Sequence, residues 1–179
     1  MKVKVQWSGL RRPGVPADVA AAIAPEEHEK LLAWAVEDGS GVTVVAGRHR
    51  LYAVTPGPDG PQLTLSRPWH LVDAGLWSGE DGSLRVTWVD GERPARFVLT
   101  DPGLLPETLR ERVQASVIIS ESLDLGNRRT ARVVVREDLT TRALLSQVLL
   151  GPGVRTTDPG VSEQVRAGLA RVREQVGLS

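Results

Sequence analysis

Two Asp-Gly pairs, each set between short segments of alternating polar and apolar residues, constrain the fold of this chain more than any other feature. The pairs are Asp81-Gly82 and Asp90-Gly91. Between them, apolar residues occupy every second position, at Leu84, Val86 and Trp88. Asp-Gly favours the tight reversal of a β-hairpin, because glycine adopts positive φ angles without a steric penalty. Residues 76–99 are therefore predicted to form a meander of antiparallel strands.

The same alternation runs through residues 30–101 and is interrupted by turn residues at short intervals. It predicts strands over 31–36, 42–54, 63–65 and 71–77. A bulge or an edge position is expected at Pro68, which cannot donate a ladder hydrogen bond. Asp101 and Pro102 then predict a helix that ends near Ser116. Its apolar stripe is formed by Leu105, Leu109 and Val113.

Two further parts flank this region. Residues 1–29 are predicted to hold a strand at residues 2–7, a linker, and a short helix from Pro16 to Ile23. Residues 117–179 are predicted to form a β-β-β-α unit, although 117–123 could also continue the preceding helix. A unit of fewer than about 70 residues rarely buries a sheet face alone, so we expect it to pack on residues 30–116.

Composition narrows the chemistry that the chain can perform. It has no cysteine, which excludes disulfides, thiol nucleophiles and thiolate metal sites. Lysine plus arginine equals aspartate plus glutamate at 22 each, so no overall field attracts nucleic acid or an anionic membrane. No apolar segment approaches the roughly 20 residues that span a bilayer. We therefore expect a cytoplasmic protein with no nucleic-acid partner and no integral membrane association.

No motif for a cofactor or a serine nucleophile is present. Gly151-Pro-Gly153 lacks the residues of a P-loop and of a dinucleotide fingerprint, and Trp77-Ser78-Gly79 lacks the first glycine of a nucleophile elbow. We therefore expect no cofactor and no catalytic residue.

His49 and His70 are the histidines that a metal site would use. If the loop at 56–61 joins two antiparallel strands, paired residue numbers add up to about 117. The two histidines are then diagonal neighbours that are one residue out of step, so they could point to opposite faces. No acidic third ligand is fixed beside them, and no metal is expected.

The five tryptophans are the next candidates for a binding surface. Trp34, Trp77 and Trp88 alternate in step with aliphatic neighbours and are predicted to lie in the core. Trp69 follows Pro68 at a strand irregularity and stands beside His70, which makes it the best candidate for a surface contact.

Arg132 and Arg136 share one face of a predicted strand and could bind phosphate or an acidic protein surface. No aromatic ladder interleaves with them, as a nucleic-acid platform requires. A solvated sheet face is the favoured interpretation of both.

Residues 30–116 resemble the pleckstrin-homology (PH) superfold, in which about seven antiparallel strands are closed by a C-terminal helix. Gly47-Arg-His-Arg-Leu-Tyr52 resembles the "T-x-x-R-L" strand of bacterial PH and GRAM-type domains, and residues 65–76 resemble their "I-x-W-x-x-I-x-x-V" segment. The chain is also similar to a group of actinobacterial proteins that share three short motifs, here Leu32 to Ala35, Pro68-Trp69 and Arg110 to Val117.

The resemblance implies an α+β fold with an antiparallel PH-like barrel or sandwich. Lipid-binding PH domains carry basic residues in their first loop, whereas this chain has Glu37-Asp-Gly-Ser-Gly41 there, so phosphoinositide binding is not expected.

Three functions remain open from the sequence. The leading hypothesis is a non-enzymatic interaction module that binds another protein or itself through a sheet edge or the Trp69 region. The second is a pocket for a small molecule or lipid between the two halves. The third is a metal-dependent hydrolase that uses His49 and His70.

Overall fold

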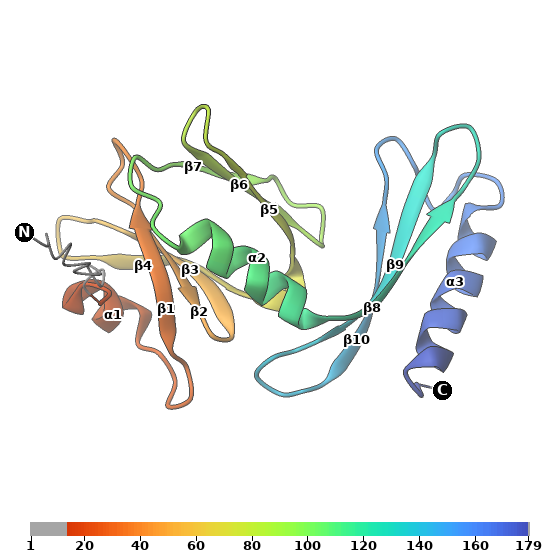
Figure 1. The fold of residues 1–179 in the computed structure, drawn as a ribbon, viewed down its shortest axis with the longest axis horizontal. Helices are drawn as coiled ribbons and strands as arrows, with labels where there is room; N and C mark the ends of the chain where they lie inside the picture. Colours follow the sequence, from red (N-terminus) through yellow and green to blue (C-terminus); the bar gives the residue numbers. More distant parts are fainter. Residues whose placement is uncertain (1–13, 179) are drawn as a thin grey trace, which may run out of the picture.

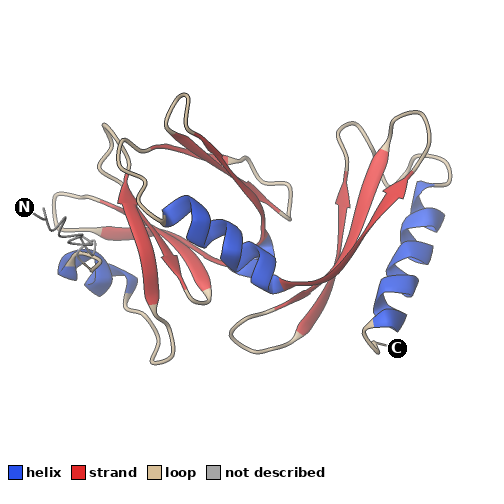
Figure 2. Cartoon of the chain, viewed as in Figure 1, coloured by secondary structure: helices blue, strands red, loops and turns tan. Residues whose placement is uncertain are grey.

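The computed structural model describes residues 14–178, and the strand expected at residues 2–7 lies outside them. The described chain forms two lobes, which Figure 1 shows side by side. We call residues 14–116 the N-terminal lobe and residues 117–178 the C-terminal lobe. Each lobe combines antiparallel sheet with helix (Figure 2), which confirms the α+β prediction.

The first sheet of the N-terminal lobe is an antiparallel meander with the order β1-β2-β3-β4. Its strands are β1 (Leu31–Val36), β2 (Thr43–Gly47), β3 (Arg50–Thr55) and β4 (Gln62–Pro68). The prediction of one strand over residues 42–54 is wrong, because Arg48 and His49 reverse the chain between β2 and β3. Neither residue has a positive φ angle, so no glycine or asparagine marks this turn.

The second sheet has the order β5-β6-β7, with β5 (Val72–Ser78), β6 (Ser83–Trp88) and β7 (Ala95–Val98). It confirms the antiparallel meander predicted for residues 76–99. A 3-10 turn, η1 (Trp69–Leu71), carries the chain from β4 into β5. It occupies the irregularity that Pro68 predicts. The two sheets share no strand ladder in residues 14–178, so of the predicted barrel or sandwich the closed barrel is not formed.

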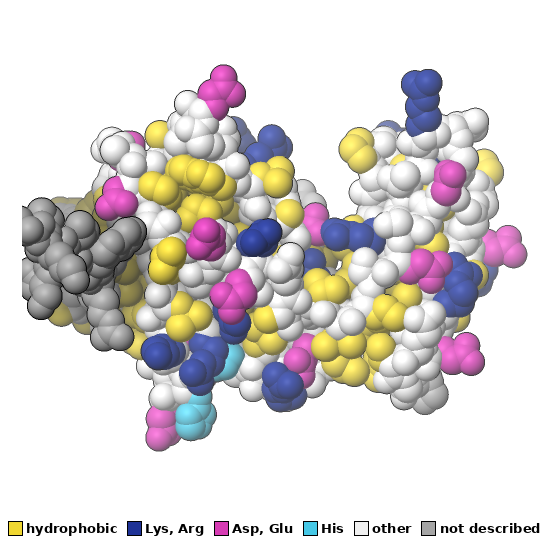
Figure 3. All heavy atoms as spheres, viewed as in Figure 1, with side chains coloured by type: hydrophobic (Ala, Val, Ile, Leu, Met, Phe, Trp, Pro, Cys, Tyr) yellow, Lys and Arg dark blue, Asp and Glu magenta, His cyan; other side chains and the backbone are white. Residues whose placement is uncertain are grey.

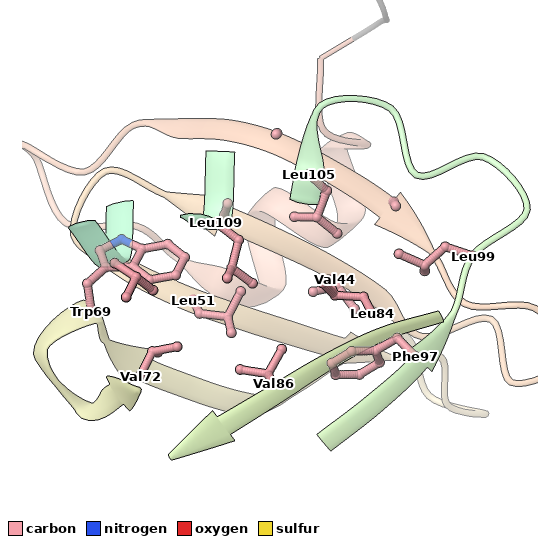
Figure 4. Packing of buried hydrophobic residues seen from close by; sticks show 14 of the residues in the cluster. Val44, Leu51, Trp69, Val72, Leu84, Val86, Phe97, Leu99, Leu105 and Leu109 are labelled. Atoms are coloured by element: carbon pink, nitrogen blue, oxygen red, sulfur yellow. The ribbon is translucent and has the colours of Figure 1, made fainter. Parts of the chain in front are cut away.

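Helix α2 (Leu105–Ser116) packs between the two sheets and completes the core. Leu105 and Leu109 are fully buried, and Figure 4 shows them pointing into the same interior as Leu51 and Val86. A side chain at Gly75 of β5 would collide with Leu109, which explains the glycine there. The helix ends where predicted. It begins at Leu105, one turn after the predicted Asp101 start.

Helix α1 (Ala17–Ile23) covers part of the opposite face of the first sheet. Its buried residues, Val19 and Ile23, pack with Val45, Tyr52 and Val54. The short helix predicted from Pro16 to Ile23 is therefore confirmed, with Pro16 at the N-cap.

The C-terminal lobe is a three-stranded sheet covered on one face by a helix. Its order is β10-β9-β8, with β8 (Val117–Asp124), β9 (Thr130–Glu137), β10 (Leu144–Leu150) and α3 (Val161–Gln175). Residues 117–123 are strand, which resolves the alternative left open by the sequence. Val133 and Val135 pack against Val161 and Val165 in a core separate from that of the N-terminal lobe.

Candidate functional site

A cleft of about 390 Å³ opens between the N-terminal lobe and the β9–β10 loop of the C-terminal lobe. Its walls come from the loop after α1, the β2–β3 turn, the start of β3, β4, and residues 138–141. The charged side chains in its lining are Glu26, Glu29, Arg50 and Asp138. Because three carboxylates face one guanidinium, we call it the acidic cleft.

Glu29 is the most buried of these carboxylates, with a side chain that is 3% exposed. Its Oε1 accepts hydrogen bonds from the backbone N–H groups of Lys30 (2.9 Å) and His49 (3.1 Å). Its Oε2 accepts one from the Tyr52 hydroxyl (2.9 Å). Within residues 14–178 no lysine or arginine forms an ion pair with it, and the nearest basic atom is His49 Nδ1 at 3.8 Å. Neutral donors therefore stabilise this carboxylate and leave its negative field in the cleft.

The turn that carries His49 is fixed from both sides. A Cβ at Gly47 would lie 2.9 Å from Glu29 Cδ and from Tyr52 Cε2, so the close approach of Glu29 requires glycine. On the other side, Trp69 Nε1 donates to the Gly47 carbonyl oxygen at 3.0 Å, and the Trp69 backbone N–H donates to that of His49 at 3.3 Å. The β2–β3 turn is therefore a rigid part of the cleft wall.

Tyr52 acts in the cleft as a hydrogen-bond donor. Burial raises the pKa of its hydroxyl well above the usual value of 10.0, and the neighbouring Glu29 carboxylate raises it further. The hydroxyl therefore stays protonated across the physiological range and keeps its hydrogen bond to Glu29.

Asp138 brings a carboxylate from the C-terminal lobe. Burial tends to raise its pKa, but hydrogen bonds from the backbone N–H groups of Thr140 and Thr141 outweigh burial and lower it overall. No lysine or arginine pairs with Asp138 among the described residues, and His70 Nδ1 lies 4.0 Å away. The cleft thus receives a carboxylate from each lobe.

The structure separates the two predicted histidines. The strand pairing itself is confirmed to within one residue, since Thr55 pairs with Gln62 and Arg50 with Pro68. His49 lines the acidic cleft beside Glu29, whereas His70 is buried behind Asp138 and outside the lining. No group of three or more His, Asp or Glu side chains in residues 14–178 is arranged to hold a metal ion.

His70 is a buried imidazole without a hydrogen bond at Nδ1 within the described part of the chain. Burial lowers its pKa below the usual 6.5, and Arg136 and Arg50 lower it further, while Asp138 opposes them. At neutral pH, His70 is therefore uncharged.

The prediction that Trp69 is a surface residue is wrong, because its side chain is fully buried. The irregularity at Pro68 is a 3-10 turn that directs the indole into the core beside Leu51 (Figure 4). Trp88 is buried as predicted, and Trp34 is partly buried, but Trp77 is 37% exposed. Trp77 lies on the edge strand β5, where alternation alone does not ensure burial.

The solvated sheet face predicted for the two arginines is wrong for Arg136, which is 1% exposed. Its Nη1 donates to the carbonyl oxygens of Val72 (2.7 Å) and Trp69 (3.4 Å), and to Ser116 Oγ (3.2 Å). Arg136 belongs to the C-terminal lobe and these acceptors to the N-terminal lobe, so this side chain joins the two.

Two neighbours extend the contact made by Arg136. Gln147 Nε2 donates to the His70 carbonyl oxygen at 2.7 Å, and Arg132 forms an ion pair with Asp73. We call Arg132, Arg136 and Gln147, together with their acceptors, the interlobe bridge. The face of β9 and β10 that is not covered by α3 therefore meets the N-terminal lobe through polar groups.

Sequence reasoning found His49 but missed Glu29, Tyr52 and Asp138. Glu29 stands in a charged segment typical of a solvated loop, and Tyr52 in a strand of apolar residues. The contacts of Glu29 with His49 and Tyr52 depend on the turn between β2 and β3, which no glycine or asparagine indicates. No short sequence motif therefore identifies the site.

Comparison of the chain with protein-family models, with curated proteins and with solved structures gives no match. No helix in residues 14–178 combines the length and the apolar character needed to cross a membrane.

Proposed function

We propose that this chain is a cytoplasmic, non-enzymatic binding protein whose acidic cleft takes a small organic cation, such as an amine with further hydrogen-bonding groups. The observation that carries the proposal is the pair of carboxylates from Glu29 and Asp138, contributed by different lobes and lacking a lysine or arginine partner among the described residues. A bound cation would supply the missing positive charge.

The Tyr52 and Ser66 hydroxyl groups in the cleft lining favour binding over catalysis. The Tyr52 hydroxyl donates to Glu29, and Ser66 Oγ accepts from Arg50 Nε at 2.9 Å. Both hydroxyls therefore position charged side chains, and neither is paired with a histidine that would activate it as a nucleophile. This geometry supports the small-molecule hypothesis more than the hydrolase that would use His49 and His70.

Calorimetric titration with 1,4-diaminobutane tests the proposal, with the dianion glutarate as the matched control ligand. We expect the diamine to bind and glutarate not to bind. Asp138→Asn should weaken diamine binding about tenfold, the loss of one charge-assisted contact. The control variant is Asp59→Asn, because Asp59 is exposed in the β3–β4 loop and remote from the cleft lining. Equal binding of both ligands, or equal losses in both variants, would refute the proposal.

Self-association is a second candidate, which the exposed edge strand β5 favours. Leu76 is 65% exposed on this strand and Trp77 is its neighbour. An unpaired edge with apolar side chains can pair with a second copy of the chain. Sedimentation velocity over a concentration series should then show a dimer that Leu76→Lys abolishes. Leu32→Lys on the edge strand β1 is the control, and a strict monomer at all concentrations would exclude this candidate.

The PH-like assignment of residues 30–116 stays part of the proposal. Support comes from the order of the elements, in which a four-stranded sheet, a three-stranded sheet and a closing helix follow one another in the chain. The β1–β2 loop contains Glu37 and Asp38. Asp38 accepts a hydrogen bond from Thr100, and this acidic loop is the reason that phosphoinositide binding is not proposed at this position.

A further inference from the structure

A second cleft of about 390 Å³ lies between β5, α2 and the beginning of the C-terminal lobe. Its charged lining residues are Asp73, Arg110, Arg132 and Arg136. Three guanidiniums thus face a single carboxylate, the reverse of the acidic cleft, and we call it the basic cleft. Figure 3 shows the molecule hollowed between its two lobes, with lysine or arginine side chains near the base of the hollow.

Asp73 neutralises only part of this charge. It pairs with Arg132, and its Oδ1 lies 3.8 Å from Arg136 Nη2. One carboxylate is therefore shared by two guanidiniums. Arg110 is exposed on α2 and has no acidic partner within 4.0 Å in residues 14–178. The excess positive charge belongs to Arg110 and to the shared pair.

Arg136 provides a positive charge in a fixed position. Its Nη1 is held by carbonyl and hydroxyl oxygens of the N-terminal lobe, and its side chain is 1% exposed. Its Nε is buried without an acceptor among the described residues. A buried guanidinium with a free donor creates a positive field at the cleft that solvent screens poorly.

We propose that the basic cleft binds an oxyanion group, a phosphate or a carboxylate, of a small molecule. Arg110 and Arg132 would contact the anion, with the Gln114 amide as a further donor, and Arg136 would act through its fixed charge behind them. The inference is independent of the acidic cleft, because no residue lines both.

Calorimetric titration with inorganic phosphate and with succinate, each against sodium chloride of equal ionic strength, tests this inference. We expect binding of at least one oxyanion. Arg110→Gln should weaken it about tenfold, because one charge-assisted contact is lost from an exposed position on α2. Arg166→Gln, on the exposed face of α3, is the matched control and should leave binding unchanged.

Asp73→Asn gives a second readout in the opposite direction. It removes the carboxylate that competes with the anion for Arg132 and Arg136, so oxyanion binding should become several-fold tighter. Arg110→Gln keeps the test valid if Asp73→Asn fails to fold. Absence of oxyanion binding in the natural chain, or equal effects of Arg110→Gln and Arg166→Gln, would overturn the inference.

A vesicle-binding experiment distinguishes a free phosphate from the phosphate of a lipid headgroup. Co-sedimentation with phosphatidylcholine vesicles is measured with and without a phosphoinositide. Binding of inorganic phosphate alone assigns a free anion, whereas vesicle binding that Arg110→Gln weakens assigns a lipid headgroup. Vesicle binding that is equal in the natural chain and in Arg110→Gln, without binding of free phosphate or succinate, would contradict the proposed oxyanion site.

Discussion

The acidic and basic clefts have similar volumes and both lie between the two lobes, yet they obtain their charge in different ways. In the acidic cleft, Glu29 is fixed by neutral donors of its own lobe. In the basic cleft, Arg136 crosses from one lobe and is fixed by acceptors of the other. We therefore expect the hydrogen bonds to Glu29 from Lys30, His49 and Tyr52, the Glu29 network, to survive separation of the lobes. The basic cleft exists only while the lobes are docked.

Arg136→Met should have the largest effect. It removes the buried guanidinium and leaves carbonyl oxygens such as that of Val72 without their donor, at a cost of about 3 kcal/mol in the free energy of unfolding. Urea denaturation measures the loss, with Arg166→Met on exposed α3 as the control. In hydrogen exchange, the His49 N–H should keep its protection because Glu29 still accepts it. Parallel loss of that protection would remove the distinction between the clefts.

Gly47→Ala should disturb the acidic cleft alone. The new methyl group would push Glu29 and Tyr52 apart, which we expect to cost about 2 kcal/mol. Diamine binding should weaken, while binding of phosphate or succinate stays unchanged. Gly14→Ala is the control, because open space surrounds that position and its φ angle is not positive. A comparable loss in oxyanion binding would show that the clefts are not independent.

Tyr52→Phe should have a smaller effect of about 1 kcal/mol on unfolding, since Glu29 keeps its two backbone donors. Thermal denaturation checks this value. Thr64→Val, which removes an exposed hydroxyl that pairs with Thr55 in the same sheet, should cost less. If Thr64→Val lowers the free energy of unfolding as much as Tyr52→Phe does, the hydrogen bond to Glu29 stabilises the fold no more than an exposed pair of hydroxyls.

The smallest effect concerns His70, whose pKa depends on charged residues that line both clefts. Asp138 raises its pKa, while burial, Arg136 and Arg50 lower it. Because the pKa of the folded state is below the usual 6.5, the uncharged imidazole stabilises the fold fully above that pH. This contribution is lost as the pH falls from 6.5 towards the lower folded-state pKa. Unfolding free energies measured between about pH 5 and pH 8 should show this decline, and His70→Gln should reduce it. An unchanged pH profile in His70→Gln would contradict the assignment.

Short sequence motifs predict those parts of the fold that depend on interactions between residues close together in the chain. Asp81-Gly82 and the spacing of Leu105, Leu109 and Val113 identified the second meander and α2, because each acts through neighbours in the chain. The turn at Arg48-His49 carries no such signal, so the sequence predicts one continuous strand there.

The clefts depend on contacts between distant parts of the chain. Alternation placed Arg136 on one face of a strand, but the sequence does not say that another lobe covers that face. The irregularity at Pro68 predicts a surface position for the indole of Trp69, but the 3-10 turn there directs it into the core.

Helix α2 ends at Ser116, and β8 begins at Val117, so no linker residue separates the lobes. Rotation of one lobe against the other must therefore be concentrated in the backbone φ and ψ angles at this junction, which would act as the hinge. Val117 itself lines the basic cleft and pairs with Arg136, at the end of the sheet from which Asp138 enters the acidic cleft. The angle between the lobes at this junction therefore sets the width of both clefts.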